Sequence, residues 1–468
     1  SQPVTIQASP AYKSDNTNNI EQISGSEDNL GILRNIKIGS FNIGSALADI
    51  LGSGVWNRIM IADLGFAATP VSLLLSLNYF MAPFVVLTGQ KSDHTNIRGY
   101  RRLPWVWGGR SLIAIGYLLL AFFTVELATT KAQGWWLGII LALSLTGIGT
   151  VLSGSAYTAL IYDRAPKHQR GRAMGLAWTM LLFGYAVSGV LFARLLPEYS
   201  TAGVLGLFTT TVLIISGLWF FSVLGEEKRQ TTTYTQPQSV RTKQSTFWED
   251  FQAVWSQRTT RLFFLYIGLS FMGAFAQDQI LEPFGAQVFD LSTGETSRFA
   301  AFWGTTALLG SILALYLQRK ISRYSYERIN RYGIFILITT FGLLGMSSFM
   351  HLGSIIRPIL LLFGIGLGMW NIGTWGLMVS VSDEQHTGTY FGLWTMASLI
   401  FRGGGAVLGA MFRDVIITIS NNISLSYGLV FFLEAVVLIA ALIIIRQVRF
   451  DTEENISQNQ VLAIAGAD

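Results

Sequence analysis

Apolar runs of about 20 residues alternate with short polar segments along most of this 468-residue chain. A helix of about 20 apolar residues is long enough to span the hydrocarbon core of a bilayer. The runs therefore predict an all-α membrane protein with twelve transmembrane helices, at 36–61, 67–89, 104–128, 134–158, 173–196, 202–225, 262–285, 296–317, 332–352, 356–381, 389–412 and 424–446.

The two halves of the chain repeat a short pattern. In the first half, GRAMGL at 171–176 leads into WTM at 178–180, and in the second half GTYFGL at 388–393 leads into WTM at 394–396. Such a repeat predicts two pseudo-symmetric six-helix bundles related by an axis along the membrane normal. The predicted parts are a disordered polar tail at 1–30, bundles at 31–225 and 259–447, a linker at 226–258 and a polar tail at 448–468.

Basic residues are concentrated in alternate loops, which predicts the orientation. The loops after the second, fourth and eighth runs contain Lys91, Arg98, Arg101 and Arg102, then Arg164, Lys167, Arg170 and Arg172, then Arg319, Lys320, Arg323, Arg328 and Arg331. The positive-inside rule places these loops, both termini and the linker in the cytoplasm. Within the linker, apolar residues of 246–255 fall on one helical face and predict a helix lying on the membrane surface.

Composition supports the membrane prediction and excludes several classes. Only 13% of residues are charged, against about a quarter in soluble domains. The net charge of +5 fits basic cytoplasmic loops, so we expect no nucleic-acid partner. The chain has no cysteine, which excludes disulfides, a thiol nucleophile and cysteine metal sites.

Charged and amide side chains inside apolar runs are the candidate functional residues, because burying them in lipid is costly. In the seventh run, Asp278 and Glu282 are four residues apart, so on a continuous helix they share a face next to Gln277. In the first run, Asn42, Asp49 and Trp56 recur every seven residues and predict one stripe. Further candidates are Asn57, Arg58, Trp370, Asn371 and Arg402, and Arg110 and Glu434 are other charges at depth.

The loop after the second run resembles the G-x-x-x-D…G-x-R/K-R/K signature of the major facilitator superfamily. The resemblance predicts an inner-face gate formed by Gly89, Asp93, Arg98, Arg101 and Arg102. An aspartate near helix ends can cap backbone N–H groups and pair with arginines. The equivalent loop of the second half has Lys320 where an aspartate would align, so the gate is one-sided.

Three longer stretches carry a more specific resemblance: GVWNRIMIADLG at 54–65, RRLPWVWGGR at 101–110 and QDQILEPFG at 277–285. Together they resemble the PucC family, the (bacterio)chlorophyll-delivery branch of that superfamily, over about 31–446. The resemblance implies a membrane assembly factor that delivers chlorophyll to, or chaperones, light-harvesting or photosystem chlorophyll-proteins. It implies antenna or photosystem chlorophyll-binding subunits as partners, chlorophyll or bacteriochlorophyll as ligand, and a thylakoid or intracytoplasmic photosynthetic membrane as location.

The residues constrain how a pigment would be held. None of the four histidines lies in the middle of an apolar run, so an axial ligand to the chlorophyll magnesium at mid-membrane would be Asn, Gln, Asp, Glu or water. No aspartate-rich pair for magnesium diphosphate is present, so we expect neither prenyl-transferase chemistry nor any other enzyme activity. We also expect no metal bound directly by the protein.

Two alternatives remain open at this point. The first is a proton-coupled transporter of a small solute, in which Asp49, Asp278, Glu282 and Glu434 would include the proton site. The second is a non-transporting scaffold that keeps the transporter fold and has lost alternating access.

Overall fold

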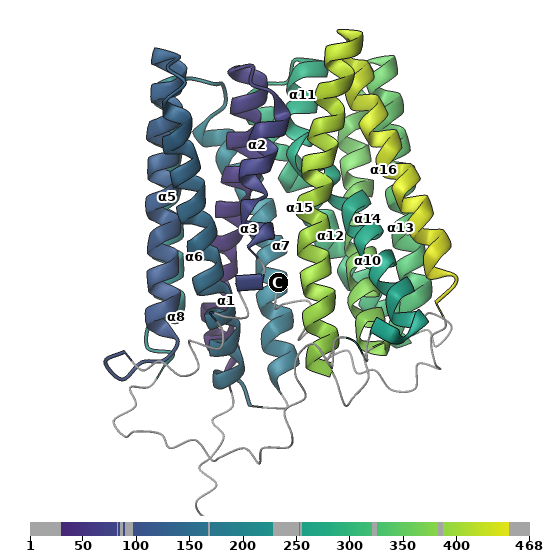
Figure 1. Ribbon diagram of the computed structural model, residues 1–468. Coiled ribbons are helices and arrows are strands. Elements are labelled where there is room, and N and C mark those ends of the chain that lie inside the picture. The colour runs from purple at the N-terminus through teal and green to yellow at the C-terminus, as the bar shows by residue number, and fades with distance from the viewer. Residues whose placement is uncertain are drawn as a thin grey trace, which may run out of the picture.

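The computed structural model describes residues 30–448 except 82, 85–87, 89–96, 167–168, 228–251, 253–254, 321–324 and 382–386. Long helices run side by side in two groups, one from each half of the chain (Figure 1). Among the described residues, ten helices are long and apolar enough to cross a membrane, and they correspond to the third to twelfth predicted spans. The predicted tails, most of the linker and its surface helix lie outside the described residues.

The first two predicted spans are helical but interrupted. The first consists of α1 (Ile32–Asp49) and two π-helical segments, η1 (Ile50–Trp56) and η2 (Ile59–Asp63). The second begins with α2 (Ala68–Leu75) and α3 (Leu77–Phe80), after which the chain is only partly described. The total of twelve spans and the cytoplasmic termini therefore stay predictions.

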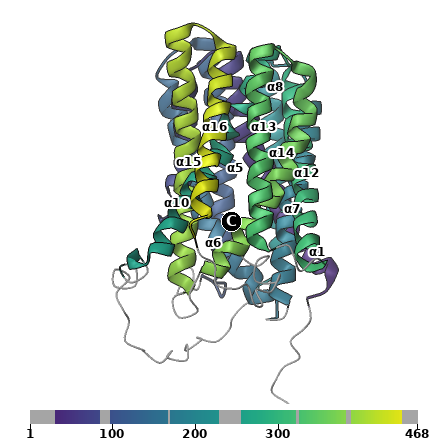
Figure 2. The same cartoon turned by 90° about the vertical axis from the view of Figure 1, so that its right-hand side faces the viewer.

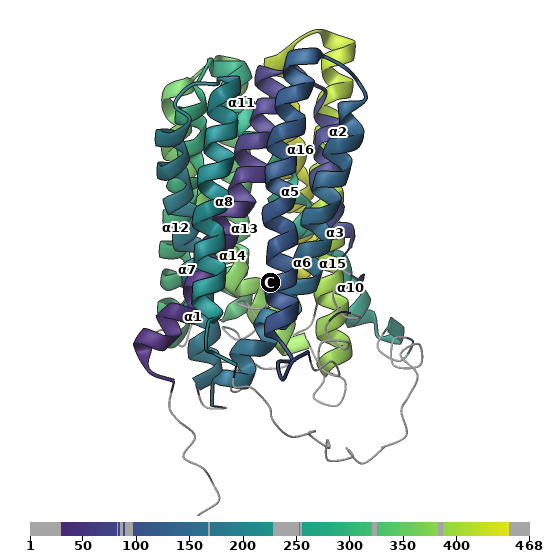
Figure 3. The ribbon, with the colours of Figure 1, turned by 90° about the vertical axis from the view of Figure 1, so that its left-hand side faces the viewer.

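The first bundle packs α1 against the long helices of its own half. These are α5 (Leu103–Thr130), α6 (Trp135–Arg164), α7 (Arg170–Leu195) and α8 (Thr201–Val223). Figure 3 shows α5 and α8 on one face of this bundle. Its core contains fully buried aromatic side chains such as Phe41, Trp56 and Trp219. Arg110 lies among them, with its guanidinium 4.3 Å from the ring centre of Phe41 and 4.7 Å from that of Trp219.

The second bundle begins with a broken helix. In place of one span at 262–285, α10 (Arg258–Phe275) ends in a 3-10 turn, η4 (Ala276–Gln279), and α11 (Leu281–Phe289) follows. The remaining helices are α12 (Thr293–Lys320), α13 (Tyr326–Met350), α14 (Ile356–Val381), α15 (Thr387–Ser420) and α16 (Ile423–Ile445). Figure 2 shows α15 and α16 beside α13 and α14.

The bundles meet through α7 against α12 and through α2 against α15. In the twelve-span count, α7 and α12 are the fifth and eighth spans, and α2 and α15 are the second and eleventh. A twofold repeat makes each span equivalent to the span six places later, so these two contacts are equivalent to each other. Glycines allow the first contact, because a Cβ at Gly189 would lie 2.5 Å from the backbone nitrogen of Ala301. A Cβ at Gly304 would likewise lie 2.9 Å from the Cβ of Tyr185.

At the end where α1 begins, Glu226 ties the first bundle together. Its carboxylate accepts hydrogen bonds from Arg34 at 2.7 Å and Lys37 at 2.9 Å, and Arg164 lies 3.5 Å away. Burial alone would raise the pKa of Glu226, but the hydrogen bonds from Lys37 and Arg34 outweigh it and hold the pKa below the ordinary value.

Candidate functional site

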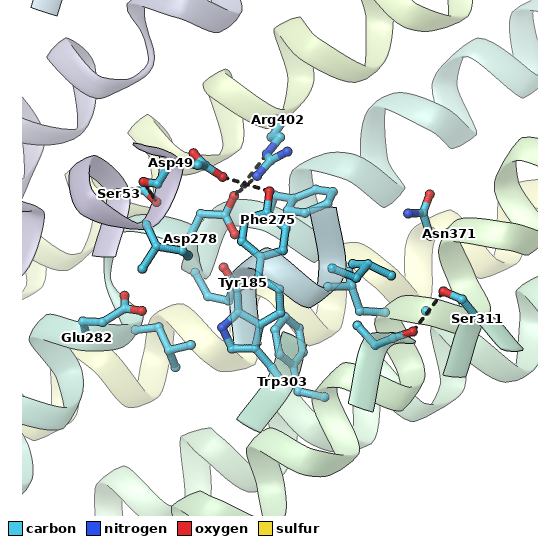
Figure 4. Close-up of a pocket in the computed structure, with 18 of the residues that line it drawn as sticks. Asp49, Ser53, Tyr185, Phe275, Asp278, Glu282, Trp303, Ser311, Asn371 and Arg402 are labelled. Atoms are coloured by element: carbon cyan, nitrogen blue, oxygen red, sulfur yellow. Dashed lines mark hydrogen bonds and ion pairs between the residues drawn. The ribbon is translucent and has the colours of Figure 1, made fainter. Parts of the chain in front are cut away.

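A cavity of about 90 Å³ lies between the bundles, where η1 faces η4. It is lined by acidic, basic, amide and aromatic side chains, among them Asp49, Asp278, Glu282, Arg402, Gln277, Asn371, Trp178, Tyr185, Phe275, Trp303 and Phe363. Figure 4 shows Asp49 and Tyr185 of the first half of the chain close to Asp278 and Arg402 of the second half. Six of the residues predicted from the sequence therefore come together here: Asp49, Gln277, Asp278, Glu282, Asn371 and Arg402.

Arg402 of α15 is the one cation among the lining residues, and it pairs with Asp278. The Nη2 and Nε atoms of Arg402 donate to Oδ2 of Asp278 at 2.8 and 3.1 Å. The guanidinium also lies 4.2 Å from the ring centre of Phe275 and 5.0 Å from that of Tyr79. The sequence placed Arg402 and Asp278 within the membrane but could not show that they pair with each other.

Asp49 and Glu282 are the two carboxylates that Arg402 does not hydrogen-bond. Asp49 accepts a hydrogen bond from the Tyr185 hydroxyl at 3.0 Å. Glu282 is 6% exposed, and no hydrogen bond or ion pair joins it to the other cavity residues drawn in Figure 4. A Cβ at Gly54 would lie 3.5 Å from Oε1 of Glu282, so η1 passes close to this carboxyl group.

The helix break between α10 and α11 aims these groups at the cavity. On an unbroken helix, Asp278 and Glu282 would share a face by their spacing alone. Instead the 3-10 turn changes the path of the chain between them, and both still line the cavity. The prediction of one continuous helix through Asp278 and Glu282 is therefore wrong. The two carboxylates nevertheless line the same cavity, as the prediction of a shared polar face implied.

The predicted stripe of Asn42, Asp49 and Trp56 does not continue to Trp56. A heptad keeps side chains on one face only if the α-helix continues, whereas η1 follows the wider π-helical i→i+5 pattern from Ile50. Asn42 donates to the backbone of Ala177 at 3.0 Å, and only Asp49 reaches the cavity. Trp56 is fully buried and donates to Thr124 at 2.8 Å.

Trp370 also lies away from the cavity lining. It is 1% exposed, with ring centres 4.9 and 5.6 Å from those of Phe271 and Phe275. Trp370 is therefore buried among the aromatic side chains of the second bundle, and its role as a binding residue stays a prediction.

Asn57 and Arg58 join the bundles at the end remote from the start of α1. Asn57 donates to the backbone oxygen of Gln279 at 2.6 Å, and Arg58 donates to Thr293 at 2.6 Å and pairs with Asp63. We call the hydrogen bonds between bundles at this end the far-end belt. It also includes Arg58 to Leu291, Gln287 to Ile61, Ala68 and Thr69 to Asp414, and Gln279 with Ser72 and Ser76.

Two arginines of the predicted gate, Arg101 and Arg102, contact residues of the first half of the chain. Arg102 pairs with Asp163 at 3.2 Å, and the backbone nitrogens of Arg101 and Arg102 donate to Glu227. Arg98 lies in a turn with φ of 55°. Gly89 and Asp93 lie outside the described residues, so the gate stays a prediction.

Sequence reasoning missed the aromatic lining of the cavity. Tyr185, Trp303 and Phe363 lie in apolar runs, where aromatic residues are most often core or lipid-facing. No feature of these runs distinguishes them from other aromatic positions. Trp178, in contrast, stands in the repeated WTM segment, which was the available signal.

The cavity does not fit a chlorophyll. Pockets for drug-sized ligands begin at roughly 300 Å³, and a chlorin with its isoprenoid tail is larger than such ligands. A volume of about 90 Å³ is well below this. Amide and carboxylate oxygens suitable for magnesium are present, but the space for the macrocycle is not, so no pigment step is assigned to this cavity.

The fold and its central site define an integral multi-pass membrane protein of the major facilitator superfamily fold. The nucleoside transporter NupG is similar in structure, with a TM-score of 0.67 at 13% identity, covering 88% of this chain and 98% of that one. The superfamily transporter FucP has a TM-score of 0.57 at 16% identity, covering 90% and 99%. At these identities the likeness shows the fold alone.

The family model described as "PUCC protein" matches residues 55–452, so the chain belongs to the PUCC family. Protein PucC of Rhodovulum sulfidophilum is 27% identical over 410 residues, covering 84% of this chain and 87% of the relative. A protein of Rhodobacter capsulatus named "Bacteriochlorophyll synthase 44.5 kDa chain" is 25% identical over 419 residues, covering 88% and 94%.

Proposed function

We propose that this protein is a non-enzymatic membrane assembly factor that delivers chlorophyll to, or chaperones, light-harvesting or photosystem chlorophyll-proteins. The observation that carries the proposal is the PUCC family match over residues 55–452. The name of the Rhodobacter capsulatus relative, which refers to bacteriochlorophyll synthesis, supports a link to pigments. The proposed location is a photosynthetic membrane, thylakoid or intracytoplasmic.

The geometry favours chaperoning of subunits over carriage of pigment through the central cavity. The cavity is too small for the macrocycle, and Trp370 and Trp394 are buried in the second bundle. Pigment-protein partners would then contact the lipid-facing sides of the bundles, where many large apolar side chains are exposed. A protein that only chaperones subunits and transports nothing would be the scaffold alternative, in which the transporter fold is kept and alternating access is lost.

Deletion of the gene in its phototrophic host tests the proposal. We expect the level of at least one chlorophyll-protein complex to fall, measured by absorption spectra of solubilised membranes and by native electrophoresis. Complementation with the wild-type gene should restore the complex. Normal levels of every such complex in the deletion strain would refute the proposal.

A second candidate function is proton-coupled transport of a small solute, and Glu434 of α16 favours it. Its side chain is 2% exposed, and neither carboxylate oxygen has a hydrogen-bond partner in the described chain. Buried carboxylates of this kind mark proton relays in transporters. Uptake of a solute into proteoliposomes driven by a pH gradient, abolished by Glu434→Gln, would support it. Absence of gradient-driven uptake with any candidate solute would count against it.

A further inference from the structure

The central cavity has more hydrogen-bond acceptors than donors. Its one guanidinium, Arg402, is already paired with Asp278, and Asp49 receives one neutral hydroxyl. Glu282 is buried at 6% exposure and points into the cavity without a partner there (Figure 4). Independently of these acids, Oε1 of Gln277 is buried and accepts no hydrogen bond from the described residues. Such acceptors require a donor or a positive charge, because leaving them bare is costly.

Aromatic rings surround the same space. Trp178, Tyr185, Phe275, Trp303 and Phe363 line it, and the ring centres of Tyr185 and Trp303 are 5.1 Å apart. Aromatic faces attract cations, and cages of such rings recognise quaternary ammonium groups. Arg402 already uses the face of Phe275 in this way, with its guanidinium 4.2 Å from the ring centre.

We propose that the central cavity binds a small organic ammonium ion, with Glu282 and Asp49 facing its charge and the rings of Tyr185 and Trp303 facing its alkyl groups. The inference does not depend on the pigment-protein role or on transport. The volume of about 90 Å³ suits a small free solute such as choline.

Other ligand classes fit the cavity less well. An anion would meet three carboxyl groups and a single guanidinium, which Asp278 already hydrogen-bonds. A directly bound metal ion needs three or more suitable ligands together, and the described part of the chain contains no such group of His, Asp or Glu. A neutral solute would give the buried Glu282 carboxylate no opposite charge.

Isothermal titration of the purified full-length protein with choline tests the proposal. The comparison ligand is the uncharged isostere of choline, in which a tert-butyl group replaces the trimethylammonium group. Both have the same shape, so they differ only in charge. We expect choline to bind about tenfold or more tightly than the isostere.

Two variants and a control locate the site. Glu282→Gln should weaken choline binding about tenfold and change isostere binding less than about twofold, and Asp49→Asn should act in the same direction. Glu198→Gln is the matched control, because Glu198 is exposed in the loop after α7 and should change neither affinity. Unchanged thermal unfolding would show that each variant is folded.

Equal affinities for choline and its isostere, or choline binding that Glu282→Gln leaves unchanged, would overturn the proposal. Failure of choline to bind at any accessible concentration would do the same and would leave a proton as the occupant of Glu282. None of these results bears on the deletion phenotype, so the two proposals fail separately.

Discussion

Replacement of Arg402 should destabilise the protein more than replacement of Asp278, although the two form one ion pair. Arg402→Met leaves Asp49, Asp278 and Glu282 around one cavity with no cation among its lining residues. Asp278→Asn leaves Arg402 with the rings of Phe275 and Tyr79 and two nearby carboxylates. The asymmetry follows from the excess of acids in the cavity.

The structure sets the magnitude of each effect. Removing one partner of a buried ion pair costs about 3–5 kcal/mol. The side chains of Arg402 and Asp278 are 25% and 20% exposed, so for Arg402→Met we expect about 2–3 kcal/mol, at or below the lower limit of that range. For Asp278→Asn we expect about 1 kcal/mol, because the amide oxygen still accepts a hydrogen bond.

Thermal unfolding of the purified protein measures the difference. With about 2–4 °C per kcal/mol for units the size of one bundle, the melting temperature should fall by about 4–12 °C for Arg402→Met and about 2–4 °C for Asp278→Asn. The double variant should be no less stable than Arg402→Met alone, because the carboxylate left unpaired is then also removed. The exposed Arg194, replaced by Met, is the control. A larger loss for Asp278→Asn, or additive losses in the double variant, would refute this account.

Three further predictions address the bundle contacts. Gly189→Val places side-chain atoms against Ala301 and should destabilise the protein by about 1–3 kcal/mol. Gly206→Val is the control, because a Cβ at Gly206 meets nothing within 4 Å and should cause no such loss. Thermal unfolding of the two variants measures the difference in stability. Asp414→Ala removes the acceptor of the first N–H groups of α2 and should cost about 1–2 kcal/mol. Faster hydrogen exchange in α2 than in the wild type, with α8 unchanged, is the readout, and equal exchange would contradict the prediction. Glu226→Gln should lower stability at neutral pH, because a carboxylate with a lowered folded pKa stabilises above its unfolded pKa. The difference from the wild type should shrink as the pH falls below the ordinary value of 4.5 and through the folded pKa, and a difference that grows in acid would be inconsistent with it.

Hydropathy was sufficient for most of the fold, because backbone groups in a bilayer must be satisfied within each segment and long apolar helices achieve this. It failed where the backbone departs from the α-helix. The segment 50–63 is as apolar as its neighbours, yet it contains two π-helical segments. No local residue pattern distinguishes a π-helical turn from an α-helical one. The two differ only in that each backbone hydrogen bond of the π-helix spans five residues instead of four.

The sequence predicted the ionisable residues of the candidate site, because they are charged side chains within apolar runs. It did not predict the aromatic residues of the site. Asp49, Asp278, Glu282 and Arg402 stand out because ionisable groups are rare in apolar runs. Their partners could not be read from the sequence, because Asp278 and Arg402 are 124 positions apart. The aromatic lining was invisible for a different reason, since the chain contains 60 aromatic residues of which only a few face the cavity.

The stretch QDQILEPFG at 277–285 shows why one motif need not mean one role. Asp278 and Glu282 line the cavity, whereas Gln279 accepts from Asn57 through its backbone and from Ser72 through its side chain in the far-end belt. Asn57 and Gln279 are 222 positions apart, and the 3-10 turn directs neighbouring side chains of the motif to the two places. A continuous helix with the same residues would have kept Asp278 and Glu282 on one face without bringing the backbone of Gln279 to Asn57. The helix break therefore joins the cavity to the contact between the bundles, and this link exists only in the folded protein.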